Sequence, residues 1–243
     1  PGGDLVAGGA SALAVRWLEQ LRAATTGAPV VPLAYGDVDV TGLTRAGLEG
    51  DVTRAYTLGR TTVQDALPGA DVLADTAWPE GGYASRDALA VLHRTGTGSV
   101  VLDGRAVPPA IDLSYTPSGR AHVPTREGRL TGLLAEPGLT DLLATRGAAP
   151  LIDAQRFVAE TAMIAAELPS GPGRTVLVMP PRRWDPDPAY LDRVVGATAD
   201  APWASAVPLR ELAATAPPEI DRAPVTYPKA QRLAELPRSY LTA

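Results

Sequence analysis

Polar and aromatic side chains follow four apolar segments of this sequence, each at the point where the apolar run stops. They are Tyr35, Asp37 and Asp39 after the first run, Trp78 and Glu80 after the second, Asp103 after the third, and Arg182, Arg183 and Trp184 after the fourth. Two carboxylates from different segments could act as general acid and general base, or as acid and nucleophile, in glycoside hydrolysis. The catalytic candidates are therefore Asp37, Asp39, Glu80 and Asp103.

The ligand-binding candidates in the same set are the aromatic and basic side chains. Trp78 and Trp184 could stack on a sugar ring, and Tyr35 lies at a corresponding position at the end of the first run. The adjacent guanidinium groups of Arg182 and Arg183 could hold a carboxylate or a phosphate through paired hydrogen bonds.

Each of these residues also has a purely structural interpretation. Aspartate and glutamate are common in loops and at helix N-caps, so Asp37 or Asp39 could simply begin the helix expected near Val40. Arg182 and Arg183 could pair with nearby aspartates or with the carboxylates of the other segments. For any single carboxylate the structural role is the more common one, whereas the group as a whole favours a ligand role.

The apolar runs are interpreted as strands that alternate with helices. The expected strands are Val30–Tyr35, Val72–Trp78, Ser99–Leu102 and Thr175–Met179. The expected helices include 11–24, 52–67, 85–94, 153–167 and 188–198. Short, almost wholly apolar strands that alternate with helices predict a parallel sheet with helices outside it. The carboxyl ends of parallel strands share one face, here called the strand-end face. This face would bring the four groups of side chains together.

The pattern changes between about residues 111 and 135, where two turn signals separate short segments of β character. This region predicts an antiparallel hairpin or meander inserted into the α/β domain. The fold class we expect is α/β, an irregular or incomplete (β/α) barrel spanning residues 1–216, with an open doubly wound sheet as the alternative. Residues 217–243 are rich in proline and are interpreted as an exit segment with one short helix near 229–236.

Composition excludes several classes of function. The chain has no cysteine, which removes disulfides, thiolate metal sites and a cysteine nucleophile. Its two histidines, His93 and His122, have no partner at metal-ligand spacing, so no metal site and no cofactor are expected. A net charge of −5 argues against nucleic-acid binding. No G-x-S-x-G, Walker or dinucleotide-binding motif occurs.

Three segments together carry a resemblance: VVPLAYGDVDV, DTAWPEGG, and RFVAETAMIAAELP followed by VLVMPPRRWDPDP. They resemble an actinobacterial family of uncharacterised cell-envelope proteins whose genes typically lie beside that of the lipid II flippase. The match runs from about Ala12 to Leu212. The resemblance implies an extracytoplasmic location and a barrel-like domain similar to the glycoside hydrolase/deacetylase superfamily. It supplies no catalytic residues.

Members of that family are typically made with a signal sequence and a C-terminal membrane anchor. Neither is found in this sequence, which is therefore interpreted as an excised extracytoplasmic piece. Deacetylases of the superfamily hold a metal with an aspartate and two histidines. This chain has no such histidine pair, which argues against metal-dependent deacetylation.

Two functions from different classes remain. The first is a non-catalytic envelope module that binds a cell-wall glycan, or a membrane or envelope protein partner, through the strand-end face. The second is a metal-independent glycoside hydrolase that uses two of the four carboxylates. Whether the chain is an enzyme depends on whether those carboxylates lie free across a cleft or are held by arginines.

Overall fold

The structure is a computed structural model that describes residues 11–144, 150–169, 171, 173–218, 220–235 and 238–241. Its helices are α1 (Ser11–Thr25), α2 (Val40–Ala46), α3 (Glu49–Ala66), α4 (Arg86–Arg94), α5 (Pro137–Ala144), α6 (Pro150–Glu167), α7 (Pro188–Ala199), α8 (Leu209–Ala214), α9 (Lys229–Ala234) and α10 (Arg238–Leu241), with short 3-10 turns η1 (Tyr35–Asp37), η2 (Glu80–Gly82) and η3 (Gly104–Ala106). Within these ranges no helix is both long and apolar enough to cross a lipid bilayer.

The strands form two small sheets whose parallel members follow chain order. They are β1 (Pro29–Val30), β2 (Asp71–Val72), β3 (Thr76–Ala77), β4 (Ser99–Asp103), β5 (Arg120–Thr125) and β6 (Gly128–Ala135). β1 pairs with β2 in parallel, and the larger sheet has the order β3-β4-β6-β5. A parallel bridge from Ala135 to Leu177 continues this series. The predicted α/β class with parallel strands is therefore confirmed, but the described residues form no closed barrel.

Three of the four predicted strands are shorter than the apolar runs that suggested them. Only β4 matches its run, extending one residue further to Asp103. The first run is a strand only at its start, because Pro32 has no N–H to donate to a ladder. The second run is divided into β2 and β3 by a turn, and the fourth contributes a single bridge at Leu177.

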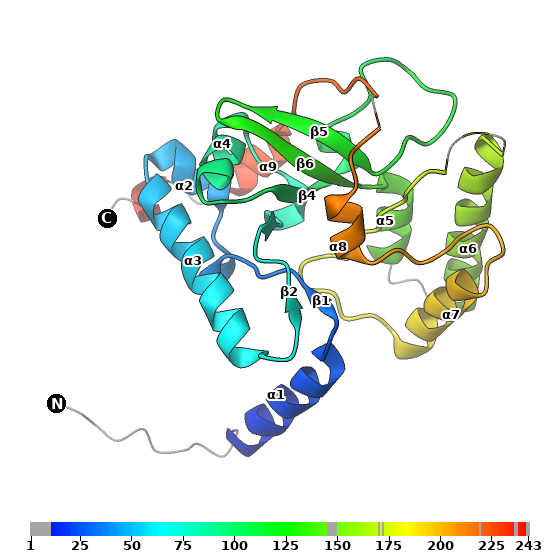
Figure 1. Ribbon diagram of the computed structural model, residues 1–243, viewed down its shortest axis with the longest axis horizontal. Coiled ribbons are helices and arrows are strands. Elements are labelled where there is room, and N and C mark those ends of the chain that lie inside the picture. The colour runs from blue at the N-terminus through cyan, green and yellow to red at the C-terminus, as the bar shows by residue number, and fades with distance from the viewer. Residues whose placement is uncertain are drawn as a thin grey trace.

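The core lies between β4 and the helices that cover the sheet. All five residues of β4 are buried, and α4 contributes a buried face that includes Leu89 and Leu92. α2, α3 and α4 lie on one side of the sheet and α5, α6 and α7 on the other (Figure 1). The α5–α7 group has its own apolar cluster around Phe157, Tyr190 and Val194. β4 itself lies between two other clusters: Val100 and Leu102 pack with α4, and Val101 packs with Met179 and Leu212.

The antiparallel pairing expected between residues 111 and 135 takes the form of the hairpin β5–β6. Its turn lies at Arg126 and Glu127, as the sequence indicated. β6, however, also pairs in parallel with β4 over Ser99–Asp103. The second strand of the hairpin is thus a member of the parallel sheet, so its carboxyl end, at Ala135, belongs to the strand-end face.

The proline-rich C-terminal segment lies along the domain instead of leading away from it. We call its described residues 220–235 the strap. Its Arg222 bridges to Pro109, and the amide of Thr226 donates to the carbonyl of Ala106. The predicted short helix is present as α9. The strap therefore crosses the region just after β4, on the same face as the candidate side chains.

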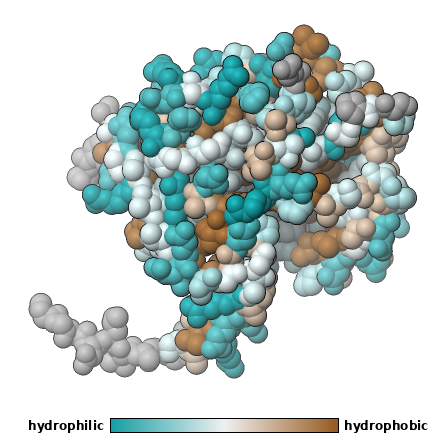
Figure 2. Space-filling model, viewed as in Figure 1, coloured by the Kyte–Doolittle hydropathy of each residue, from teal (hydrophilic) through white to brown (hydrophobic). Residues whose placement is uncertain are grey.

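α1 projects from the amino end of β1 (Figure 1). Leu18 and Leu21 are half-buried, whereas Leu13 and Trp17 are exposed. Hydrophobic atoms are visible on this helix in Figure 2, at the edge of the molecule. α1 lies away from the strand-end face, because the face is at the opposite, carboxyl end of the strands.

Candidate functional site

An ion pair joins the first and last of the four predicted groups. Nε of Arg182 lies 3.0 Å from Oδ2 of Asp37, although the N–H is not aligned for a hydrogen bond. Asp37 adopts a left-handed backbone conformation with φ 47° and follows Gly36 with φ 70°. The tight turn of η1 thus positions the carboxylate beside the guanidinium, and the two predicted site residues meet.

The same guanidinium also holds the end of the second run. It lies 4.5 Å from the centre of the Trp78 ring and donates a hydrogen bond of 2.7 Å to the Trp78 carbonyl. The indole Nε1 of Trp78 lies 3.0 Å from the Met179 sulfur, and its ring packs on a cluster that includes Leu212. Trp78 is therefore occupied by contacts within the chain.

A tyrosine that sequence reasoning missed lies beside this ion pair. Tyr56 on α3 is buried, and burial raises the pKa of its hydroxyl. The positive charge of Arg182 lowers this pKa and the negative charge of Asp37 raises it, so both charges are close to the ring. Tyr56 lies in the middle of a helix, where the sequence gives no sign that it faces a strand end.

Asp39 has the structural role considered as its alternative. Its carboxylate accepts a 2.8 Å hydrogen bond from the amide of Gly42 and so caps α2. A side-chain carbon on Gly42 would lie 2.6 Å from Oδ2 of Asp39, so glycine makes room for the cap. Asp39 is only half-buried, yet its oxygen is used by the helix terminus.

Asp103 is buried at the end of β4 and is also held by its own chain. Oδ1 accepts a 2.7 Å hydrogen bond from the amide of Arg105, and Oδ2 lies 3.3 Å from the Arg105 guanidinium. Arg105 in turn pairs with Asp141 at 2.5 Å. Burial, followed by the charge of Asp103, raises the pKa of the nearby Tyr83. Asp103 therefore begins η3 and belongs to a structural network.

The remaining predicted residues do not gather at one point. Tyr35, Glu80 and Arg183 are exposed. Trp184 is half-buried against the α5–α7 cluster. Of the four candidate carboxylates, Glu80 is thus the one on the surface, while three others are engaged by an arginine or by a helix terminus.

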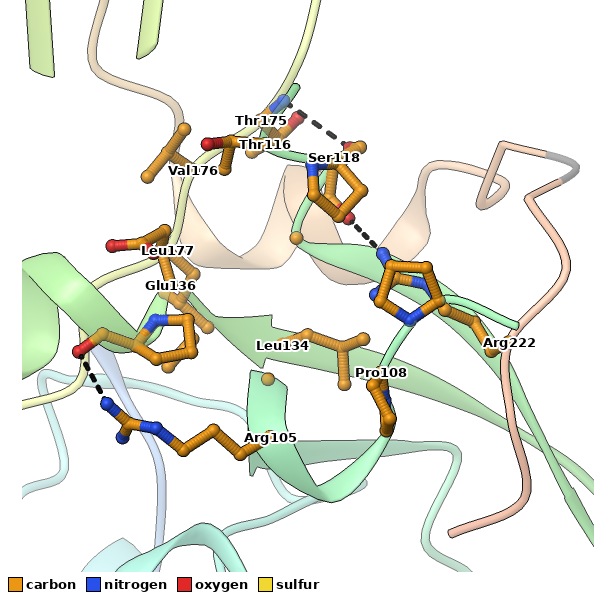
Figure 3. A pocket seen from close by; sticks show the side chains of 16 residues that line it. Arg105, Pro108, Thr116, Ser118, Leu134, Glu136, Thr175, Val176, Leu177 and Arg222 are labelled. Carbon is orange, nitrogen blue, oxygen red and sulfur yellow. Dashed lines mark hydrogen bonds between the residues drawn. The ribbon is translucent and has the colours of Figure 1, made fainter. Parts of the chain in front are cut away.

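A pocket of about 270 Å³ opens at the ends of β4 and β6 (Figure 3). Its lining comes from the residues after β4, the residues before β5, the end of β6, the segment 175–177, and the strap through Arg222. Most of its walls are apolar. Glu136 directly follows β6, so it fits the pattern of a polar side chain at the end of a parallel strand. It was not among the predicted residues because its strand was assigned to the antiparallel insertion.

Across the described ranges, no group of three or more His, Asp and Glu side chains is arranged to hold a metal ion. His93 lies in the last turn of α4 and His122 on β5.

Solved structures with a similar fold include two carbohydrate-related proteins. A 4-alpha-glucanotransferase from Thermococcus litoralis has a TM-score of 0.64 at 12% identity, over 90% of this chain and 34% of that one. A Mycobacterium smegmatis protein proposed to be a polysaccharide deacetylase has a TM-score of 0.54 at 15% identity, over 84% of this chain and 68% of that one. The chain thus spans about a third of the glucanotransferase. At these identities the likeness concerns the fold.

No curated protein sequence matches the chain. A sequence profile described as a family of unknown function, DUF6049, matches residues 15–242, nearly the whole chain. On that match, the chain belongs to the DUF6049 family.

Proposed function

We propose that this chain is a non-catalytic module of the cell envelope that binds a glycan through its strand-end face. It holds the glycan without cleaving it. The fold is of the kind used by carbohydrate-active enzymes, and the face that would carry the chemistry is used here for binding.

The proposal rests on the contacts that three of the four candidate carboxylates already make within the chain. Asp37 pairs with Arg182, Asp39 caps α2, and Asp103 accepts from Arg105. A glycosidase needs two carboxyl groups that face each other across an open site, with one free to donate a proton. Carboxylates held by arginines and helix termini favour a fixed architecture over proton transfer.

The accessible side chains on this face suit binding. Tyr35 is 56% exposed and sits in η1, next to the Asp37–Arg182 pair. An exposed aromatic ring beside a rigid group presents a flat surface at little cost in conformational entropy. Tyr35 is therefore the side chain that we expect to contact a sugar ring, in place of Trp78 and Trp184.

An extracytoplasmic location is part of the proposal. It is supported by the resemblance of the VVPLAY, DTAWPEGG and PPRRW segments to envelope proteins. Protease treatment of intact cells producing the full-length protein tests the location. Degradation in intact cells would support it, and protection until lysis would contradict it.

Binding is tested by co-sedimentation of the chain with insoluble peptidoglycan and arabinogalactan. We expect the wild-type chain to sediment with one of them and Tyr35→Ala to remain in solution. Trp17→Ala is the matched control, because Trp17 is an equally exposed aromatic residue on α1, away from the strand-end face.

The same incubations are assayed for newly formed reducing ends. If the wild-type chain releases sugar and Glu80→Gln does not, the non-catalytic proposal is overturned in favour of a glycoside hydrolase. Absence of sedimentation with either polymer would overturn the glycan proposal and direct the search to a protein partner on this face.

A further inference from the structure

The pocket at the ends of β4 and β6 contains a cation, Arg222, for which the described residues supply no counter-charge. Arg222 reaches the pocket wall from the strap and donates to two backbone carbonyls, Val107 at 3.2 Å and Ser118 at 2.8 Å. Figure 3 shows its guanidinium turned toward Ser118 at one side of the pocket. Its Nε is buried and has no hydrogen-bond partner among the described residues.

A comparison with Arg105, on the same pocket, shows what Arg222 lacks. Arg105 has two carboxylate partners, Asp103 and Asp141. Within the described residues no carboxylate lies within ion-pair distance of Arg222. Burial lowers the pKa of Arg222, which means that its charge is partly removed from water. A desolvated cation without a counter-charge is a site where an anion gains free energy.

The walls beside Arg222 are apolar and rigid. They are formed chiefly by proline rings and aliphatic side chains, of which Pro108, Leu134, Val176 and Leu177 are labelled in Figure 3. The carboxylate at the opposite side, Glu136, is used to cap α5, accepting from the amides of Gly138 and Leu139. Apolar walls beside one cation that lacks a carboxylate partner select a ligand with a charged end and an apolar body.

The volume limits the size of that ligand. About 270 Å³ is close to the lower limit of pockets that take drug-sized molecules, and corresponds to roughly nine water volumes. A group the size of one amino-acid residue fits, whereas a chain of sugars does not.

We propose that this pocket binds a carboxylate carried on a short apolar group, with the carboxylate on Arg222 and the apolar part against the proline and leucine walls. This site goes beyond the glycan-binding proposal and does not depend on it. The same chemistry is found in a free acid with an aliphatic chain and at the C-terminus of a peptide. Since Arg222 belongs to the strap, the ligand would also fix the strap to the strand ends.

Titration of the chain with N-acetylleucine, followed by the NMR shifts of backbone amides, tests the site. We expect saturable shifts at Gly119 and Ala135, and none with N-acetylleucine amide, which lacks the charge. Arg222→Ala should weaken binding at least tenfold, while Arg210→Ala, which removes a surface arginine paired with Asp71, should leave it unchanged. Equal binding of acid and amide, or no binding of the acid, would overturn the proposal.

A second variant keeps the site testable if Arg222→Ala does not fold. Val176 is exposed at the pocket mouth, so Val176→Trp should fill the space without removing the cation or the fold. Binding that survives in Val176→Trp would contradict the site. A tripeptide ending in leucine is titrated in parallel, and the tighter of the two acids identifies the source of the carboxylate. Glucuronate, which has a carboxylate on a polar ring, should bind more weakly than either, and equal binding would contradict the role of the apolar walls.

Discussion

Arg182 lies between Asp37 and Trp78, with Nε 3.0 Å from the carboxylate and the guanidinium 4.5 Å from the ring centre. The three residues come from the ends of three different apolar runs. One side chain thus joins the loops of the first, second and fourth runs. This arrangement makes Arg182 a structural residue of the strand-end face.

Replacing Arg182 by alanine is expected to lower the free energy of unfolding by about 2–3 kcal/mol. The change removes a charge-assisted hydrogen bond and a cation–π contact, and leaves Asp37 without its partner. Urea unfolding followed by tryptophan fluorescence measures it. Arg183→Ala is the matched control and should stay within about 0.5 kcal/mol, because Arg183 is exposed. If the two variants lowered the free energy of unfolding equally, the contacts of Arg182 would not stabilise the fold.

Asp39→Ala is expected to cost about 1 kcal/mol of stability through loss of the α2 cap. Asp39→Asn should cost only a few tenths, since asparagine caps helices as well as aspartate does. Thermal or urea unfolding distinguishes the two variants. If asparagine destabilised the chain as much as alanine, the negative charge of Asp39 would have a role other than capping.

Gly59 on α3 is expected not to tolerate a side chain. A carbon at its Cβ position would lie 2.0 Å from the carbonyl oxygen of Leu33, and the backbone that follows carries Tyr35. Gly59→Ala should therefore destabilise the chain by about 1–3 kcal/mol. Gly50→Ala, on the same helix with open space around it, should leave stability unchanged or raise it by up to about 1 kcal/mol. If chemical denaturation gave the same free energy of unfolding for Gly59→Ala and Gly50→Ala, α3 would not approach the backbone at Leu33 so closely.

Glu167 is expected to make stability depend on acid pH. Burial raises the pKa of its carboxyl, but hydrogen bonds from Thr116 and Arg174 outweigh burial and lower it below the ordinary 4.5. A lowered pKa means that the carboxylate stabilises the fold above pH 4.5, and that this contribution is lost as the pH falls through the folded pKa. Wild type should exceed Glu167→Gln at pH 7 in urea unfolding, and the difference should shrink below about pH 4.5. A difference that is constant from pH 7 to 3 would contradict this assignment.

The sequence predicted the alternation of helices and strands because apolar runs and proline or glycine stops are local signals. β4 and α4 follow directly from them. The same signals could not show that the run at 175–179 would make one bridge. Its neighbour in space, β6, is set by tertiary packing.

The residues of the strand-end face were partly predictable for the same reason. A polar side chain that directly follows a strand can be seen in the sequence, and Asp37 and Arg182 do meet. Tyr56 and Arg222 reach the face from a helix and from the strap, far along the chain. Their place on this face depends on how distant segments pack, so no local sequence pattern predicts it.

The strap gives the chain an order of assembly during synthesis. Arg222 contacts Val107 across 115 residues of chain, and the strap's other pairings with this region span similar separations. On the ribosome, β1 to β6 emerge and can begin to pair well before the strap exists. Until translation reaches the strap, the apolar walls beside β4 stay open to water and to chaperones. Completion of this face is thus coupled to the synthesis of almost the last segment of the domain.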